Sequence, residues 1–229
     1  MNYEIEGNSM QVLKLTLQNG ESVYADSGKL VSKSENVAMT PRLVGGIIKA
    51  LERKVTGATG MLTEFKAGGD SATLSVAGIM PGKIKAMELG AGESFIAEHD
   101  AFLAAGSGVD FTAQTVGIGP AFFGGAGFVL QKFKGPGNVF MHVSGDILEY
   151  ELDGTTALEV DPGHIAGFDD SLSYKIRFVD NIRSAMFGCV GLFLAKFEGK
   201  GRVILHSVSR YKLSSAIYTQ GLAETQGKK

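Results

Sequence analysis

The chain has 229 residues and a formal net charge of −2, so no basic surplus points to nucleic acid as a partner. Its 44% apolar content is enough to bury a sizeable core, which excludes a mainly disordered chain. A single cysteine excludes an intrachain disulfide. No basic and apolar leader follows Met1, and no apolar run approaches the ~18 residues of a membrane span. We therefore expect a cytoplasmic protein without a transmembrane segment.

The first predicted elements form an antiparallel hairpin. Apolar and polar residues alternate from Val12 to Leu17, which indicates a half-buried strand. Asn19-Gly20 is typical of a two-residue hairpin turn, and residues 21–26 are predicted to be the returning strand. The 32 glycines of the chain favour many such turns between short strands. These features predict a fold that is mainly β.

One segment interrupts the β pattern. Thr40 can cap a helix and Pro41 suits its first turn. Apolar residues then recur with a period of about 3.6 residues from Val44 to Val55. We predict a short helix near residues 42–54, inserted into this part of the chain only. Its apolar stripe favours docking on the chain's own sheet over docking on a partner.

Two blocks of sequence recur at fixed offsets. The hairpin block Gly20-Glu21-Ser22-Val23 returns at an offset of 72 as Gly92-Glu93-Ser94-Phe95, and a weaker copy around Leu152 follows at a further 63. Phe123 to Ser144 and Phe187 to Val208 share ten residues at an offset of 64. Residues 57–76 hold a degraded third copy of this second block. Chance does not repeat a pattern in this way, so the fold is predicted to be built from repeated units.

The matches predict three units of about 65 residues each, at residues 9–79, 82–144 and 145–208 of one domain spanning 1–229. Linked copies of a β unit bury their faces best by closing around a pseudo-threefold axis, because closure removes exposed strand edges. The polar tail of residues 219–229 is expected to be loose.

A glycine turn occupies the same place in two of these units. Gly135-Pro136-Gly137 and Gly199-Lys200-Gly201 stand at equivalent positions. Proline followed by glycine is typical of a type II turn, whose third residue has a positive φ. We therefore predict positive φ at Gly137 and Gly201.

A set of short motifs follows the pattern of one known family. They are Gly20-Glu21-Ser22-Val23, the Gly45-Gly46 pair, Ala101-Phe102-Leu103-Ala104, Phe123-Gly124-Gly125, Gly135-Pro136-Gly137 and Val160-Asp161-Pro162-Gly163-His164. From about Gln11 to His206 the chain resembles the altered inheritance of mitochondria family, number twenty-four, a former domain of unknown function in bacteria and archaea.

The resemblance implies a β-sandwich or barrel fold with internal threefold pseudo-symmetry, akin to the tryptophan RNA-binding attenuation protein. It also implies a link to respiratory-chain and inner-membrane organisation, and it supplies no catalytic residues. Family members often carry Glu in a Gly-Gly-Glu-Gly block, where this chain has Ala126 and Val190. Any role that needed this carboxylate is not carried over to this chain.

Two histidines are candidate ligand residues. His142 and His206 are equivalent in the repeat, and closure around an axis would bring them together. A metal site needs three or four converging ligands, and the remaining unit is predicted to offer Ser75 at this position. We predict structural or surface histidines, with ligand contact as the alternative and without a metal.

A second candidate lies in the loop from Asp161 to His164. The sequence Asp-Pro-Gly is first of all typical of a turn. His164 has no Ser or Cys at the spacing of a catalytic triad, so we predict no catalytic role for this loop. The glycine-rich stretch at residues 124–127 leads into a predicted strand rather than a helix, so it does not have the form of a phosphate loop.

These observations favour a non-enzymatic scaffold or binding protein that needs no cofactor, with protein partners or a homo-oligomer. The first alternative is a small-molecule-binding protein or enzyme that uses the pseudo-axis or the His164 loop. The second alternative is RNA binding, which rests on fold analogy only, and nucleic acid is otherwise not expected as a partner.

Overall fold

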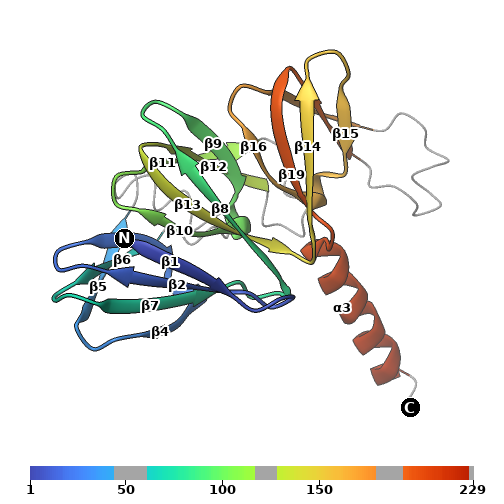
Figure 1. Ribbon diagram of the computed structural model, residues 1–229. Helices are drawn as coiled ribbons and strands as arrows, with labels where there is room; N and C mark the ends of the chain where they lie inside the picture. The colour runs from blue at the N-terminus through green and yellow to red at the C-terminus, as the bar shows by residue number, and fades with distance from the viewer. Residues whose placement is uncertain (44–60, 117–127, 179–192, 227–229) are drawn as a thin grey trace.

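The computed structural model describes residues 1–43, 61–116, 128–178 and 193–226, which are built mostly from short antiparallel strands (Figure 1). This confirms the predicted mainly-β fold. In chain order the elements are β1 (Asn2–Glu6), β2 (Val12–Leu17), β3 (Ser22–Asp26), η1 (Ser27–Lys29), β4 (Leu30–Lys33), β5 (Val37–Leu43), β6 (Met61–Ala67), β7 (Ala72–Ala77), β8 (Gly82–Leu89), β9 (Ser94–Glu98), η2 (His99–Ala101), β10 (Phe102–Gly106), β11 (Asp110–Val116), β12 (Phe128–Lys134), β13 (Gly137–Ser144), β14 (Ile147–Asp153), β15 (Leu158–Val160), η3 (Pro162–His164), β16 (Ile165–Asp169), β17 (Ser173–Phe178), β18 (Phe193–Glu198), β19 (Lys200–His206) and α3 (Arg210–Gln226). The elements written η are short 3₁₀ helices.

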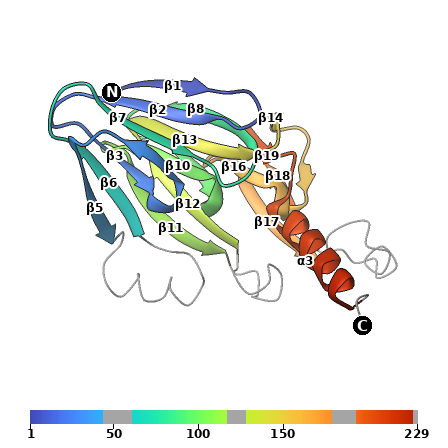
Figure 2. The same cartoon turned by 90° about the horizontal axis from the view of Figure 1, so that it is seen from below.

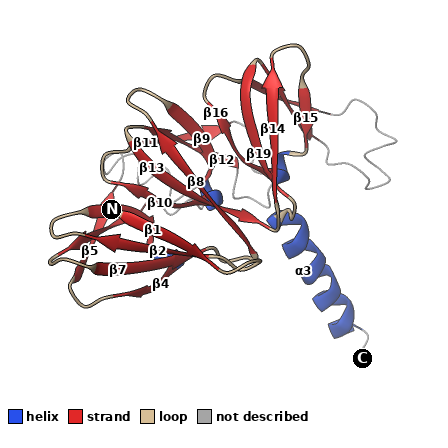
Figure 3. Ribbon diagram, viewed as in Figure 1, coloured by secondary structure: helices blue, strands red, loops and turns tan. Residues whose placement is uncertain are grey.

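The strands form four sheets (Figure 3). Their strand orders are β1-β2-β7-β4 in the first, β5-β6-β3-β10-β13-β8 in the second, β11-β12-β9-β16-β19-β14 in the third and β15-β18-β17 in the fourth. A hydrophobic core lies between each sheet and the next, so the two middle sheets are buried on both faces.

The sequence patterns of the strands follow from this layering. In β2 the alternation is confirmed, because Leu13, Leu15 and Leu17 are fully buried while Lys14 is exposed. The predicted hairpin is wrong, because β2 pairs with β1 and β7, while β3 pairs with β6 and β10 in another sheet. The strand β13 lies in the second sheet, and its residues from Val139 to Ser144 are all buried. A strand covered on both faces has no polar face, so β13 reads as a continuous buried run and not as an alternating one.

The same irregularity marks three strands. Each of β4, β10 and β16 follows a 3₁₀ helix and shifts its register once against its neighbour. The shifts fall between Leu30 and Ser32, Phe102 and Ala104, and Ile165 and Gly167. These positions are related by the offsets of 72 and 63 found between the sequence blocks. The bulges support the predicted repeat, while the pseudo-threefold axis stays a prediction.

The inserted helix was predicted partly in the wrong place. Thr40, Pro41 and Arg42 belong to β5, which pairs along its length with β6. Strand pairing therefore replaces the predicted helix start at Thr40 and Pro41, because each of these residues lies opposite a partner in β6. Residues 44–54 lie outside the described residues.

The C-terminal segment differs from the loose tail expected for residues 219–229. Residues 219–226 form the end of α3, which leaves the sheets at its first turn and extends away from them (Figures 1 and 2). The Ser209 hydroxyl accepts a hydrogen bond from the Lys212 N–H at 3.4 Å, which is the geometry of a helix cap. The cap at Ser209 therefore marks the start of a helix in a segment without a clear apolar face.

The repeated glycine turn has the predicted sign of φ. Gly137 has a φ of +142° and Gly201 a φ of +157°, so both predicted positive values are confirmed. The type II assignment is wrong, because that turn requires a φ near +80° at this position. At Gly137 a Cβ atom would lie 2.9 Å from the Val109 Cγ2 atom, so close packing also favours glycine here.

Candidate functional site

Three acidic residues begin the three 3₁₀ helices in the same way. The carboxylate of Asp26 accepts from the Gly28 N–H at 2.9 Å, and Asp161 accepts from the Gly163 N–H at 2.9 Å. Glu98 accepts from two backbone N–H groups of η2, at 2.9 and 3.1 Å. Each acid satisfies N–H groups that a helix start leaves without a partner. The order of the chain places these caps at corresponding points of the three predicted units.

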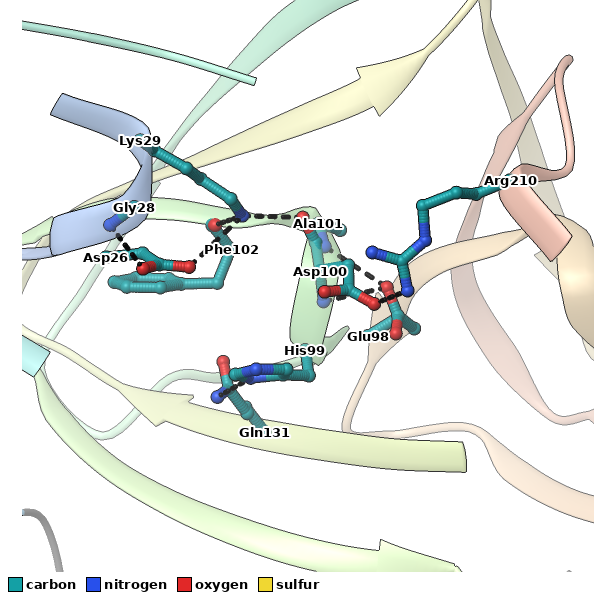
Figure 4. A network of polar contacts seen from close by, with 10 residues as sticks. All are labelled: Asp26, Gly28, Lys29, Glu98, His99, Asp100, Ala101, Phe102, Gln131 and Arg210. Carbon is teal, nitrogen blue, oxygen red and sulfur yellow. Dashed lines mark hydrogen bonds and ion pairs between the residues drawn. The ribbon is translucent and has the colours of Figure 1, made fainter. Parts of the chain in front are cut away.

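A buried lysine joins the first two of these helices. Lys29 is 5% exposed, and its ammonium donates to the backbone carbonyls of Asp100, at 2.7 Å, and Phe102 (Figure 4). Its Nζ atom also lies 3.9 Å from an oxygen of Asp26. Burial lowers the pKa of Lys29 to about 8, and the charges of Asp26 and Glu98 oppose this change. Lys29 is therefore mostly protonated at pH 7, and its hydrogen bonds link η1 to η2.

The helix α3 contributes its first residues to the same region. The Arg210 guanidinium donates to the Asp100 carboxylate (Figure 4), and Lys212 pairs with Asp161 at 2.7 Å. Desolvation of its carboxyl group raises the pKa of Glu98 to about 7, and the positive charges of Arg210 and Lys29 oppose this change. The start of α3 thus places two cations beside the acids of η2 and η3.

The two repeat-equivalent histidines, His142 and His206, lie near one another where the second predicted unit contacts the third. The His206 Nδ1 atom accepts from the Ser144 N–H at 2.9 Å, two residues beyond His142, and both rings are buried. Burial lowers the pKa of His142. Burial also lowers the pKa of His206 to about 4, with smaller effects from His142 and His164. Both rings are therefore neutral at neutral pH.

Strand register corrects the third position of this set. Val12, Ile84 and Ile147 are equivalent by the offsets of 72 and 63. They pair with Ala77, His142 and His206. The residue that corresponds to the two histidines is therefore Ala77 and not Ser75. Alanine carries no ligand atom, so the set offers two imidazoles.

The predicted loop residues take structural positions. Asp161 caps η3, as expected for a turn. The His164 Nδ1 atom lies 2.8 Å from the His206 carbonyl oxygen, which can only accept, so this nitrogen carries the proton. The structure thus brings the predicted residues His142, His164 and His206 to one region, with Asp161 at its border.

We call the charged and imidazole residues of this region the junction cluster. Its members are Asp26, Lys29, Glu98, Asp100, His142, Asp161, His164, His206, Arg210 and Lys212. Sequence reasoning missed six of these site residues, which are Asp26, Lys29, Glu98, Asp100, Arg210 and Lys212. The alignment of Asp26, Glu98 and Asp161 at offsets of 72 and 63 was the signal that could have found the acids. Nothing in the local sequence marks Lys29, because its burial comes from packing between units.

Beside the cluster, His99 and Gln131 form a further contact. The Gln131 Nε2 atom lies 2.7 Å from the His99 Nδ1 atom (Figure 4). Gln131 is 3% exposed, and its Oε1 atom has no hydrogen-bond partner within the described part of the chain. Among the described residues no three His, Cys, Asp or Glu side chains are placed to hold a metal ion. No described helix is long and apolar enough to span a membrane.

Comparisons with known proteins identify the family. The chain is 28% identical over 211 residues to the uncharacterized protein M6_Spy0233 of Streptococcus pyogenes serotype M6, which covers 88% of this chain and 84% of the relative. The crystal structure of protein SPYM3_0169 from Streptococcus pyogenes matches with a TM-score of 0.80 at 23% identity, over 96% of this chain and 99% of that one. The family model described as "Mitochondrial biogenesis AIM24" matches residues 3–208. The chain therefore belongs to the AIM24 family.

Proposed function

We propose that this AIM24-family protein is a non-enzymatic scaffold. The observation that supports this is the internal use of the charged groups in the junction cluster. Lys29 bonds two backbone carbonyls, Glu98 bonds two backbone N–H groups, and Asp100 pairs with Arg210. Groups that act on a substrate keep polar atoms free to contact it, and this often lowers the stability of the protein. Groups that satisfy one another instead hold three packed units together.

The scaffold role is tested by removing the three caps one at a time. We expect Asp26→Ala, Glu98→Ala and Asp161→Ala each to lower the free energy of unfolding by about 0.5–2 kcal/mol, as the loss of a helix cap does. The measurement is urea unfolding of each variant beside the parent. Asp153→Ala is the matched control, because Asp153 accepts from the Thr155 N–H at 2.8 Å in an exposed turn outside the cluster.

A small-molecule site at the junction cluster is the second candidate function. One observation favours it: the pKa of Glu98 is raised, and the pKa values of His142 and His206 are lowered. Shifted pKa values gather at functional sites. If the cap variants are more stable than the parent, the cluster carries a functional cost and the scaffold proposal fails. The predicted homo-oligomer and the kinship in fold with the tryptophan RNA-binding attenuation protein stay predictions.

A further inference from the structure

Each predicted unit pairs with the next through equivalent strands. The strand β10 of the second unit pairs with β3 of the first, with Ala104 opposite Ala25. The strand β16 of the third unit pairs with β9 of the second, with Gly167 opposite Ala97. The residue numbers of the second contact are those of the first shifted by 63 and 72. The two junctions are therefore the same contact, made twice.

The first and third units each have one strand that lacks this contact. By the same offsets, β4 of the first unit is equivalent to β10 and β16, and β15 of the third unit is equivalent to β3 and β9. A third contact of the same kind would therefore pair β15 with β4. In the described part of the chain β4 pairs with β7 alone, and β15 pairs with β18 alone. Figure 1 shows β4 and β15 in sheets at opposite ends of the molecule. One molecule thus presents the two complementary halves of its own internal junction.

The side chains at these two edges are complementary in charge. In the internal junction Ala97 of β9 lies opposite Gly167 of β16. The equivalent residues are Val160 in β15 and Ser32 in β4, so the proposed register places Val160 opposite Ser32 and Glu159 opposite Lys33. Both charged residues are exposed. Glu159 is also paired with Arg177 at 2.6 Å, so Lys33 would join an existing ion pair. Opposite charges on directly facing strand residues stabilise the pairing.

We propose that β15 of one molecule pairs with β4 of a second copy of this chain. The internal junctions pair three residues each, and the proposed contact has the same length. The contact is heterologous, because two different edges meet, so it forms a ring where the rotation closes and a filament where it does not. The inference rests on the proposed scaffold role and deepens it by naming the partner.

Self-association of the full chain tests the proposal by sedimentation velocity over a wide concentration range. We expect the parent to form species heavier than one chain as its concentration rises. Lys33→Glu and Glu159→Lys each place like charges opposite one another, and each should weaken self-association by about 3- to 10-fold. Lys66→Glu, an equal charge change at an exposed residue of β6, is the matched control and should associate like the parent.

Mixing separates contact between molecules from contact within one molecule. An equal mixture of the Lys33→Glu and Glu159→Lys chains restores opposite charges at every contact between unlike molecules, so it should assemble like the parent. The double variant should do the same. If the parent stays monomeric, or if the single variants assemble like the parent, the proposal is wrong. If the double variant is restored and the mixture is not, the contact lies within one chain and the proposal is also wrong.

These readouts are independent of the cap series. The cap variants report the free energy of unfolding, and the edge variants report mass. A monomeric parent with destabilised cap variants leaves the scaffold role standing and removes only the second copy as its partner. Unfolding curves of Lys33→Glu and Glu159→Lys confirm that each variant is folded before its mass is interpreted.

Discussion

Replacing Lys29 with methionine tests whether this charge is buried at the junction of the first two units. Methionine keeps most of the length of the side chain and removes the ammonium. In the folded protein burial lowers the pKa of Lys29 from 10.5 to about 8. Below pH 8 the folded and unfolded chains both hold the proton, so Lys29 adds no pH dependence. Between pH 8 and pH 10.5 only the unfolded chain holds it, so the stability of the parent rises with pH.

The size of this rise follows from the width of the window. One pKa unit corresponds to about 1.4 kcal/mol, so the parent should gain about 3 kcal/mol across the window relative to Lys29→Met. At neutral pH two effects oppose each other in the variant. Two carbonyls lose their donor, which lowers the stability by about 1–3 kcal/mol each. The free-energy cost of burying the ammonium is also removed, which raises the stability. The pH-dependent difference is therefore more informative than the stability at one pH.

The assay is urea unfolding of the parent and of Lys29→Met at several values from pH 7 to pH 10.5. Other groups that titrate in this range contribute equally to both proteins and cancel in the difference. Lys66→Met removes a charge from an exposed position of β6 and is the matched control. A difference between the parent and Lys29→Met that does not change from pH 8 to pH 10.5 would refute the burial of this charge.

Three further outcomes follow from the structure. Because the pKa of Glu98 is raised to about 7, the folded protein holds a proton that the unfolded chain loses between pH 4.5 and pH 7. Glu98→Gln should therefore gain up to about 3 kcal/mol relative to the parent across this window in urea unfolding; an unchanged difference contradicts this. Because the pKa of His206 is lowered to about 4, acid protonates the unfolded chain first, and the parent should lose about 2–3 kcal/mol relative to His206→Asn from pH 6.5 to pH 4. Equal acid unfolding of both proteins would rule this out. Gly137→Val should cost about 1–3 kcal/mol in thermal unfolding through its positive φ and its contact with Val109, and a melting temperature equal to that of the parent would show that the turn tolerates a side chain.

Local patterns were sufficient to predict β2 and β3 as strands and the positive φ of Gly137 and Gly201, but not the sheets in which the two strands pair or the type of the glycine turn. The alternation from Val12 to Leu17 places every second side chain on one face, and this is independent of what covers that face. The positive φ values at Gly137 and Gly201 were predicted because a backbone requirement appears directly as a glycine. The caps at Asp26, Glu98 and Asp161 are equally local, since each carboxylate bonds N–H groups within three residues.

Predictions that needed contacts distant in sequence were less successful. Thr40 and Pro41 have the local signals of a helix start, but pairing of β5 with β6 places them in a strand. Ser75 was aligned with the two histidines by its neighbourhood in sequence, while the register against β2 selects Ala77. Backbone pairing between strands overrode the local signal in both cases.

The sequence alone therefore determined the first strands and the sign of φ at two glycines, because each depends on neighbouring residues. It also predicted the repeat that the bulges support, because the repeat appears as a fixed offset. Only the tertiary structure decided which charges are buried together. Lys29 lies 71 residues from Asp100, and Arg210 lies 110 residues from the same residue. Their contacts depend on how separate sheets pack, and the free energy of a buried charge depends on its surroundings in space and not on its neighbours along the chain.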